Sequence, residues 1–395
     1  MLALLAASYG EFHPTTVDLA AAPYKFSIVD WELSRLPSKW LYRVREATPG
    51  GPAWTRQQRI AQAQEFFQMG QELGRLDREL LFPEAHLGAS ASPPREAREL
   101  REAMARLEER RRSGQGLVEA TLESEVAAVL AREGLATRWG VFPPVSAVFT
   151  SPPHVLVISP RDRIARQQDV LLRPGLGSAE REEMEERIFR EADLSALVTE
   201  TGGVALYPSV VLDSAGLHHA VVTMTHEWLH QWLIFRPLGR AFWSSPEMAS
   251  LNETAATIAG QELGDLVYTR LTGQVVDRPP PWAPEARDPD AFDFRAEMGE
   301  TRRRTEELLA QGQIEEAEAY MEERRQLFVA HGHLIRKLNQ AYFAFHGTYA
   351  TSPASISPIG DQVQELRARS DSVGDFLRTV ARFGSYQEFL DYLEG

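Results

Sequence analysis

The stretch HHAVVTMTHEWLHQWLIF, which runs from His218 to Phe235, decides what kind of fold to expect. Within it, His226 and His230 are four residues apart, and Glu227 directly follows the first of them. Residues at positions i and i+4 share one face of a helix, so two imidazoles placed in this way converge on one metal ion. A glutamate beside the first histidine can reach the water of that metal. The motif therefore predicts an apolar helix that carries two zinc ligands and a general base.

A third ligand is expected from the downstream sequence LNETAATIAG. Glu253 lies 23 residues after His230, near the start of a second apolar helix, and the small Ala256 lets the two helices approach closely. Catalytic zinc sites use three protein ligands and keep a further position open. The predicted zinc ligands are therefore His226, His230 and Glu253. The two histidines that open the stretch, His218 and His219, are expected to be surface residues of the first helical turn.

A candidate substrate-binding strand precedes the histidine helix. The sequence TGGVALYPS contains Gly203, Val204 and Ala205, whose small side chains leave the backbone accessible. An edge strand of this kind can bind an extended peptide through its free N–H and C=O groups. The alternative is an ordinary strand that ends in a tight turn.

A donor for the oxyanion of a tetrahedral intermediate is also expected, because hydrolysis of an acyl group needs one. The sequence NQAYFAFHGTYA offers Tyr342, His346 and Tyr349. We favour Tyr349, since Gly347 predicts a loop and a loop tyrosine can reach into a cleft. The alternative is that these side chains belong to the core, as helix aromatics usually do.

The composition limits the classes of function. The chain has 395 residues, of which 43 % are hydrophobic and 25 % charged, as in folded soluble proteins. Its formal net charge of −14 argues against a nucleic-acid partner, which would need clustered Lys and Arg. The chain has no cysteine, which excludes disulfides, iron–sulfur clusters, thiolate zinc sites and cysteine nucleophiles.

The N-terminal sequence MLALLAAS leaves two interpretations open. Its apolar run, Leu2 to Ala7, is too short to span a bilayer and lacks the basic region of a signal peptide. It is either an ordinary helix start or the remnant of a transmembrane or signal segment. The first interpretation is compatible with a cytoplasmic protein, and the second with one held at a membrane by an N-terminal segment.

The order of the predicted elements gives a fold class of α+β, predominantly helical. We expect a helical N-terminal region at 1–135, a catalytic core with strands at 136–275, and a helical C-terminal region at 276–395 that closes the cleft, all in one compact unit. Two local expectations concern helix ends. A turn at Gly114 and Gly116 should separate two helices, and a later helix should run from Ile314 to about Phe345.

The motifs HEWLH and NETAA together resemble those of the gluzincin zinc peptidases, and among these a group of bacterial putative aminopeptidases. The resemblance extends loosely over most of the chain. It implies a thermolysin-like zincin core, in which a small mixed sheet with an edge strand, the active-site helix and the glutamate helix are embedded in helical regions. It also implies that His226, His230 and Glu253 bind Zn²⁺, that Glu227 acts as base and acid, and that an N-terminal hydrophobic anchor is common.

This chain departs from the family pattern at two points. Thr257 stands where many gluzincins have an aspartate that contacts a ligand histidine, and no acidic pair can be assigned to the free amino group that an aminopeptidase binds.

We therefore predict a zinc-dependent peptide hydrolase in which Glu227 deprotonates a metal-activated water. A peptide would lie along Gly203, Val204 and Ala205, and Tyr349 or His346 would help to stabilise the oxyanion. Two alternatives stay open. The chain is either a zinc-containing but inactive binding or scaffold protein, or a zinc hydrolase of non-peptide substrates. Exopeptidase and endopeptidase action are both compatible with the sequence.

Overall fold

The computed structural model describes residues 14–47, 54–84, 95–277 and 292–395. The contacts within the chain divide it into two compact units. The first unit comprises Met1–Phe26, Pro153–Glu200 and Glu300–Phe345, and the second comprises Ser27–Pro152, Thr201–Gly299 and His346–Gly395. The three-part division expected from the sequence stays a prediction. The apolar run from Leu2 to Ala7 lies outside the described residues.

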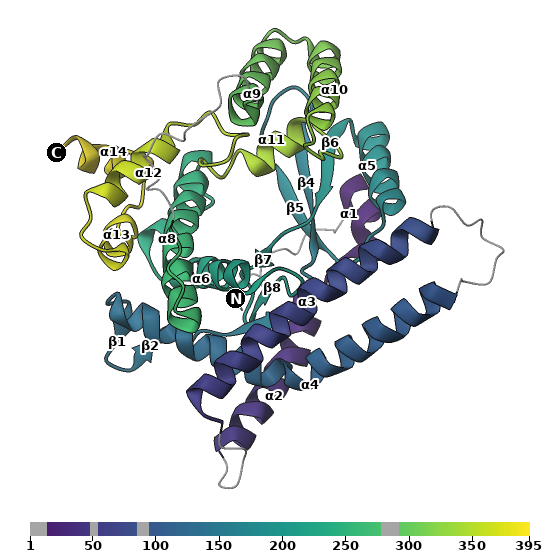
Figure 1. Cartoon of the computed structure of the whole chain (residues 1–395). Coiled ribbons are helices and arrows are strands. Elements are labelled where there is room, and N and C mark those ends of the chain that lie inside the picture. The colour runs from purple at the N-terminus through teal and green to yellow at the C-terminus, as the bar shows by residue number, and fades with distance from the viewer. Residues whose placement is uncertain (1–13, 48–53, 85–94, 278–291) are drawn as a thin grey trace. The chain divides into compact units, whose positions relative to one another are not determined.

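The first unit is built around a three-stranded antiparallel sheet with the strand order β5–β4–β6. Its strands are β4 (His154–Pro160), β5 (Gln168–Leu172) and β6 (Leu194–Thr199). Leu156 and Ile158 pack against α1 (Thr16–Ala21) and α5 (Ser178–Ala192), whereas Val155 and Val157 pack against α11 (Gln340–His346). Alternate residues of a strand point to opposite faces, so this apolar strand is buried on both sides. In Figure 1, α11 lies on one side of the sheet, and α1 and α5 lie on the other.

Two helices of the C-terminal half form a hairpin, α9 (Phe294–Ala310) and α10 (Ile314–Ala330). Gly312 makes the turn with a φ of 75°, a value that favours glycine. The predicted single helix from Ile314 to about Phe345 is wrong. It ends at Ala330, Gly332 follows with a φ of 87°, and α11 begins only at Gln340.

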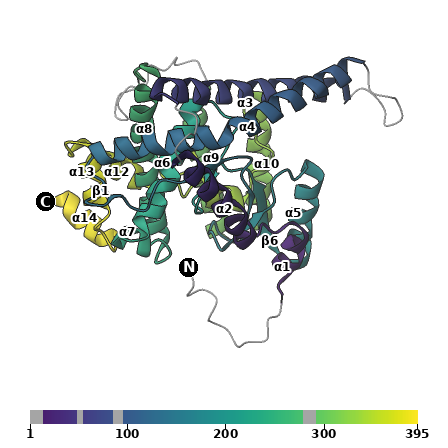
Figure 2. The ribbon, with the colours of Figure 1, turned by 90° about the horizontal axis from the view of Figure 1, so that it is seen from below.

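Long helices make up the N-terminal part of the second unit: α2 (Ile28–Ala47), α3 (Arg56–Glu84) and α4 (Arg95–Arg132). Figure 2 shows α3 and α4 side by side. The predicted turn at Gly114 and Gly116 is wrong, because α4 runs through both glycines. At Gly116 a Cβ would lie only 2.7 Å from the ring of Tyr42, so the glycine provides room for α2 rather than a break.

Two small sheets accompany these helices. The strands β3 (Ala147–Phe149), β7 (Gly203–Val204) and β8 (Ser209–Val211) form a mixed sheet, and β1 (Ala136–Thr137) pairs with β2 (Gly140–Val141). In the mixed sheet, β8 is central, β3 lies parallel to it and β7 antiparallel. Among the described strands β7 pairs with β8 alone, which leaves it at an edge.

The HEWLH segment lies on α6 (Leu217–Leu233), which packs most extensively on α8 (Pro246–Thr272), the helix that carries Glu253. Two glycines of α8 bring the helix backbones together. A Cβ at Gly260 would lie 2.9 Å from the Cα of His226, and one at Gly264 would lie 2.6 Å from the Cα of Val222. The hydroxyl of Thr225 also donates to the Gly260 carbonyl at 2.6 Å. Contact at the backbone therefore sets the helix separation.

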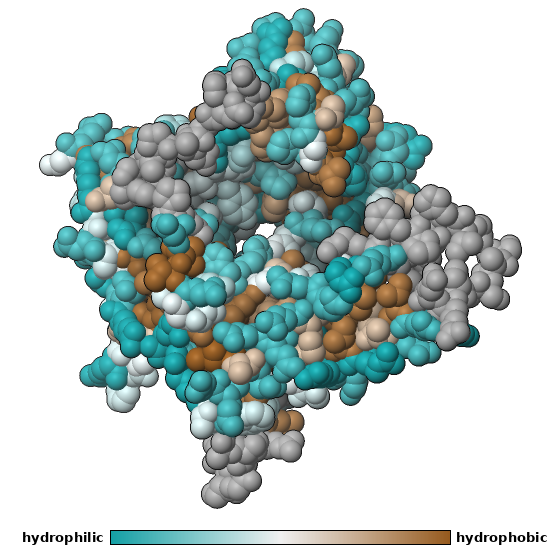
Figure 3. Space-filling view, viewed as in Figure 1, coloured by the Kyte–Doolittle hydropathy of each residue, from teal (hydrophilic) through white to brown (hydrophobic). Residues whose placement is uncertain are grey.

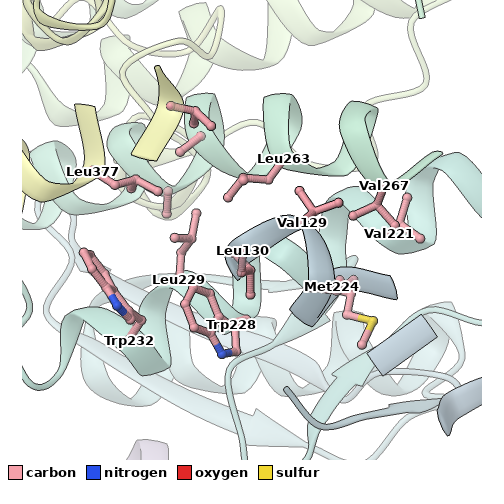
Figure 4. Close-up of a cluster of buried hydrophobic side chains, with 14 of the residues drawn as sticks. Val129, Leu130, Val221, Met224, Trp228, Leu229, Trp232, Leu263, Val267 and Leu377 are labelled. Carbon is pink, nitrogen blue, oxygen red and sulfur yellow. The ribbon is translucent and has the colours of Figure 1, made fainter. Parts of the chain in front are cut away.

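The largest apolar core lies in the second unit. Figure 4 shows side chains of α4, α6, α8 and the C-terminal helices meeting there, among them Leu130, Trp228, Leu263 and Leu377. Three short helices complete the core: α12 (Ile359–Ala368), α13 (Val373–Val380) and α14 (Tyr386–Glu394). On the face drawn in Figure 3, hydrophilic side chains separate patches of apolar ones.

The fold class expected from the sequence, α+β and predominantly helical, is confirmed. Within the described ranges, no helix is both long enough and apolar enough to cross a membrane.

Candidate metal centre

The structure brings His226, His230 and Glu253 together within the second unit. The Nε2 atoms of the two histidines are 3.0 Å apart. One carboxylate oxygen of Glu253, Oε2, lies 3.3 Å from Nε2 of His230 and 3.7 Å from Nε2 of His226. Three potential ligand atoms from two helices thus face one point.

One polar atom of this group has no hydrogen-bond partner in the described part of the chain, and the two imidazole nitrogens compete for one proton. Oε2 of Glu253 is buried and accepts no hydrogen bond within the described residues. The two imidazoles direct their Nε2 atoms at each other and at this oxygen, so only one proton fits between the two nitrogens. A buried carboxylate oxygen without a donor is costly. These three residues could therefore hold a metal ion, which would satisfy all three atoms at once.

The electrostatics of the centre couple its three groups. Burial alone would lower the pKa of His230, but the Glu253 carboxylate and the neighbouring Glu227 raise that pKa to about 9. Burial alone would raise the pKa of Glu253, but His230 and His226 hold it well below its usual range. The carboxylate is therefore charged at neutral pH, as a metal ligand must be.

Asn252 orients one of the two histidines. Its side-chain oxygen Oδ1 lies 3.0 Å from Nδ1 of His230, and the residue is only 1 % exposed. Because an amide oxygen can only accept, Nδ1 carries a proton, so Nε2 is the nitrogen that would give up its proton and bind a metal. The sequence did not identify this partner: it showed only that Thr257, four positions after Glu253, cannot fill the role of the family's aspartate.

Glu227 is buried beside the edge strand β7. Burial raises the pKa of its carboxyl group, against the opposing effect of His226 and His230. A Cβ built on Gly203 would lie 2.7 Å from Oε1 of Glu227 and 2.6 Å from the methyl group of Thr223. Gly203 is therefore in direct contact with the candidate base, and only the lack of a side chain allows this approach.

The segment after β7 is tied to α6 by the residue that follows His230. The amide Nε2 of Gln231 donates to the carbonyl of Leu206 and, at 2.8 Å, to the hydroxyl of Ser209. The predicted substrate-binding residues are all partly exposed. Gly203 and Val204 form β7, and Ala205 follows it.

The predicted oxyanion donors are divided between the units. Tyr342 belongs to the first unit, where burial raises its pKa to about 12. His346 and Tyr349 belong to the second unit, and burial lowers the pKa of His346 to about 4. The residue after Tyr349 is tied to the residue after Glu253, because the N–H of Ala350 donates to the Thr254 hydroxyl at 3.1 Å.

The first two histidines of the stretch make no part of this metal-binding group. Nε2 of His218 lies 2.6 Å from a carboxylate oxygen of Asp265, and its ring packs edge-on against Tyr268. His218 thus links α6 to α8, while His219 is exposed, in agreement with a place in the first helical turn.

No family model, curated protein or solved structure matches this chain. The resemblance to gluzincin peptidases therefore stays a prediction that rests on the motif residues alone.

Proposed function

We propose that this protein is a zinc-dependent peptide hydrolase. The observation that carries the proposal is the convergence of the ligand atoms of His226, His230 and Glu253 beside the buried carboxyl group of Glu227. Two imidazoles and a carboxylate, with a glutamate next to the first histidine, match the requirements of a catalytic zinc site.

The distances between the ligand atoms support zinc as the metal. Zinc binds nitrogen and oxygen ligands at about 2.0–2.1 Å in tetrahedral sites, so neighbouring ligand atoms stand roughly 3.3 Å apart. The three distances in this centre, 3.0, 3.3 and 3.7 Å, lie around that value. Calcium would instead need six to eight oxygen ligands, and this centre offers two nitrogens and one carboxylate.

Zinc bound by the three ligands would supply Lewis acidity, which activates water and polarises a carbonyl group. The residues of this chain would then move the protons. Glu227 would accept a proton from the attacking water on a carboxylate oxygen and later donate it to the leaving amine nitrogen. Its raised pKa favours both steps, since it brings the carboxyl group closer to neutral pH.

A peptide substrate would pair with the edge strand β7. The contact between Gly203 and Glu227 supports this idea, because a peptide beside β7 would pass close to the candidate base. Tyr349 and His346 are the candidates for the oxyanion donor. We further propose that the mixed sheet, α6 and α8 form a thermolysin-like core.

The proposal is tested by measuring the zinc content of the protein, its cleavage of a broad peptide library, and the activity of one variant. We expect about one zinc per chain and turnover of some peptides, in line with the one ligand group found among the described residues. The variant Glu227→Gln should keep the metal and lose hydrolysis by about 10²–10⁴-fold, because it removes the base but none of the ligands. Equal cleavage by variant and parent would refute the mechanism. Zinc binding without turnover of any peptide would favour the scaffold alternative.

A further inference from the structure

A pocket of about 400 Å³ lies in the second unit, at the C-terminal end of α6. Its lining includes three arginines, Arg236, Arg378 and Arg382, and no acidic side chain. Trp232 forms another part of the wall. Trp232 follows His230 by two residues, which turns it about 200° around the helix and away from the metal centre. The pocket is therefore a separate site that does not rest on the proposed function.

Arg236 carries a positive charge that no acidic residue balances. Its guanidinium lies over the ring of Trp232, with Cζ 3.3 Å from the ring centroid, and it donates to the Trp232 carbonyl at 2.6 Å. Within the described part of the chain no carboxylate pairs with it, and burial lowers its pKa to about 10. A half-buried cation without a counter-ion is costly, so the pocket lacks negative charge.

The indole N–H of Trp232 lacks an acceptor. The residue is 2 % exposed, and its Nε1 has no hydrogen-bond partner among the described residues. By contrast, Trp228 on the same helix donates its Nε1–H to the Pro143 carbonyl at 2.8 Å. Buried indole N–H groups usually find such a partner. A residue that lines the pocket thus holds a buried donor without a partner, beside the unbalanced cation of Arg236.

Capping of a helix end explains the position of only one of the three pocket arginines. Arg378 donates to the carbonyls of Glu133 and Gly134 at 3.0 and 3.2 Å, just after α4, where a cation offsets the partial negative charge of the helix end. Nη2 of Arg378 also lies 3.8 Å from a carboxylate oxygen of Asp375, so among the described residues Arg378 is the one pocket arginine with an acidic partner. Capping does not account for the N–H of Trp232 or for Arg382, which has no ion-pair partner in the described ranges.

We propose that this pocket binds a phosphate group. An anion in the pocket would neutralise Arg236 and Arg382. Phosphate offers more acceptor oxygens than a carboxylate, and guanidinium groups match its geometry with paired hydrogen bonds.

Apolar residues next to the pocket residues in sequence indicate two possible sources of the phosphate. Trp139, Phe142, Ile234 and Phe235 are 84 %, 51 %, 57 % and 56 % exposed, and the rings of Phe142 and Phe235 are 5.1 Å apart. Exposed aromatic side chains beside arginines are typical of surfaces that contact lipid headgroups. The phosphate therefore comes either from a lipid headgroup or from a soluble phosphate compound, and the test has one arm for each.

The soluble arm uses calorimetric titration with inorganic phosphate and with glycerol phosphate. We expect saturable binding that weakens as salt rises, and about tenfold weaker binding, or about 1.4 kcal/mol, in Arg236→Gln and in Arg382→Gln. The second variant changes an exposed side chain, so its folding is not at issue. Arg240→Gln is the matched control, because Arg240 is exposed and lies outside the pocket lining.

The lipid arm uses co-sedimentation with phosphatidylcholine vesicles, with and without phosphatidylglycerol. Binding to the anionic vesicles that is lost in both Arg382→Gln and Trp139→Ser supports the proposal and makes a headgroup the source. Binding in the soluble arm alone supports it with a soluble phosphate as the source. The proposal is overturned if neither arm shows binding, or if the Arg240→Gln control weakens binding as much as the two pocket variants.

Discussion

At the scale of single residues, Asn252 shows how one amide can prepare a metal ligand. Its oxygen holds a proton of His230 on Nδ1, so Nε2 is the nitrogen that would bind a metal. We expect Asn252→Ala to weaken zinc binding by about 10–100-fold, the usual effect of losing such a partner. A competition titration with a chromogenic chelator measures this.

The control for this prediction is Asn252→Asp, which keeps an acceptor oxygen at the same place and should bind zinc more tightly than the alanine variant. If alanine and aspartate variants bind zinc equally well, the contact between Asn252 and His230 plays no part in metal binding.

His346 should make the protein sensitive to acid. Burial lowers its pKa to about 4, compared with about 6.5 in an unfolded chain, so folding favours the neutral ring. Its contribution to stability is complete above about pH 6.5 and is lost as the pH falls toward 4, with about 2 kcal/mol gone at pH 5. Urea unfolding at pH 7 and pH 5 measures the loss.

The matched variant for this measurement is His346→Gln, which cannot titrate. It should lose less stability than the parent between the two pH values. An identical loss in both proteins would show that other groups cause the acid sensitivity.

The sequence predicted some site residues better than others for a simple reason. His226, Glu227 and His230 are related by the helical repeat, which can be counted along the chain. The contact between Asn252 and His230 joins two helices, and its geometry depends on how α6 crosses α8. Such a contact has no fixed spacing in sequence, so the partner of His230 could not be identified once Thr257 was seen to lack the family's carboxylate.

At the scale of elements, β7 offers a direct test of the proposed substrate strand. A Cβ at Gly203 would collide with Thr223, with Glu227 and, at 2.9 Å, with the carbonyl of Val210. We expect Gly203→Ala to displace β7 or Glu227 and to lower hydrolysis by at least about tenfold, because small misplacements at a reacting centre are costly. Steady-state kinetics on a peptide substrate measures the effect.

Gly202→Ala is the control for this prediction. The nearest atom to a Cβ at Gly202 is 3.4 Å away, on the flexible side chain of His219, so the change should be tolerated. Zinc binding should persist in both variants, since neither residue is a ligand. Equal activity of both variants would remove β7 from the proposed site.

Element boundaries were predicted less well than element types. Glycine has a low helix propensity, which suggested a break in α4, but the penalty of about 1 kcal/mol per glycine is small beside the packing of a long helix. The strand β5 (Gln168–Leu172) lies within the region where strands were expected, but QDVLL shows no clear alternation that would set its bounds. Contacts with distant parts of the chain determine both the continuity of α4 and the position of β5.

At the scale of the whole molecule, removal of the metal should affect the two units differently. The ligand group lies in the second unit, and a ligand that binds only the folded state stabilises it, by about 4 kcal/mol at 1,000 times the dissociation constant. A chelator should therefore speed hydrogen exchange in α6 and α8 and leave β4 and β6 unchanged, as measured by mass spectrometry of peptic fragments.

In the variant His226→Ala the chelator should have no effect, because a ligand is missing from the start. Unchanged exchange in the parent protein would contradict a metal in this centre. An equal change in both units would show that they unfold together.

The sequence did not predict which segments of the chain belong to each unit. Each unit joins segments that are far apart in the chain. In the first unit, for example, Arg161 forms an ion pair with Glu318 at 2.7 Å, although 157 positions separate them. The sequence alone suggests regions that are consecutive in the chain, because local patterns do not show which distant segments contact each other. The predominance of helices, by contrast, follows from local periodicity and was predicted correctly.

The glycine contacts between α6 and α8 have a consequence for ion size. Gly260 and Gly264 place the two helices in backbone contact at His226 and Val222, so a movement of α8 that carried Glu253 away from the histidines would break that contact. A large cation such as Ca²⁺, which binds oxygen at 2.3–2.6 Å, would force them apart. The close spacing of α6 and α8 thus favours binding of small ions over large ones, in addition to the preference set by the ligand atoms.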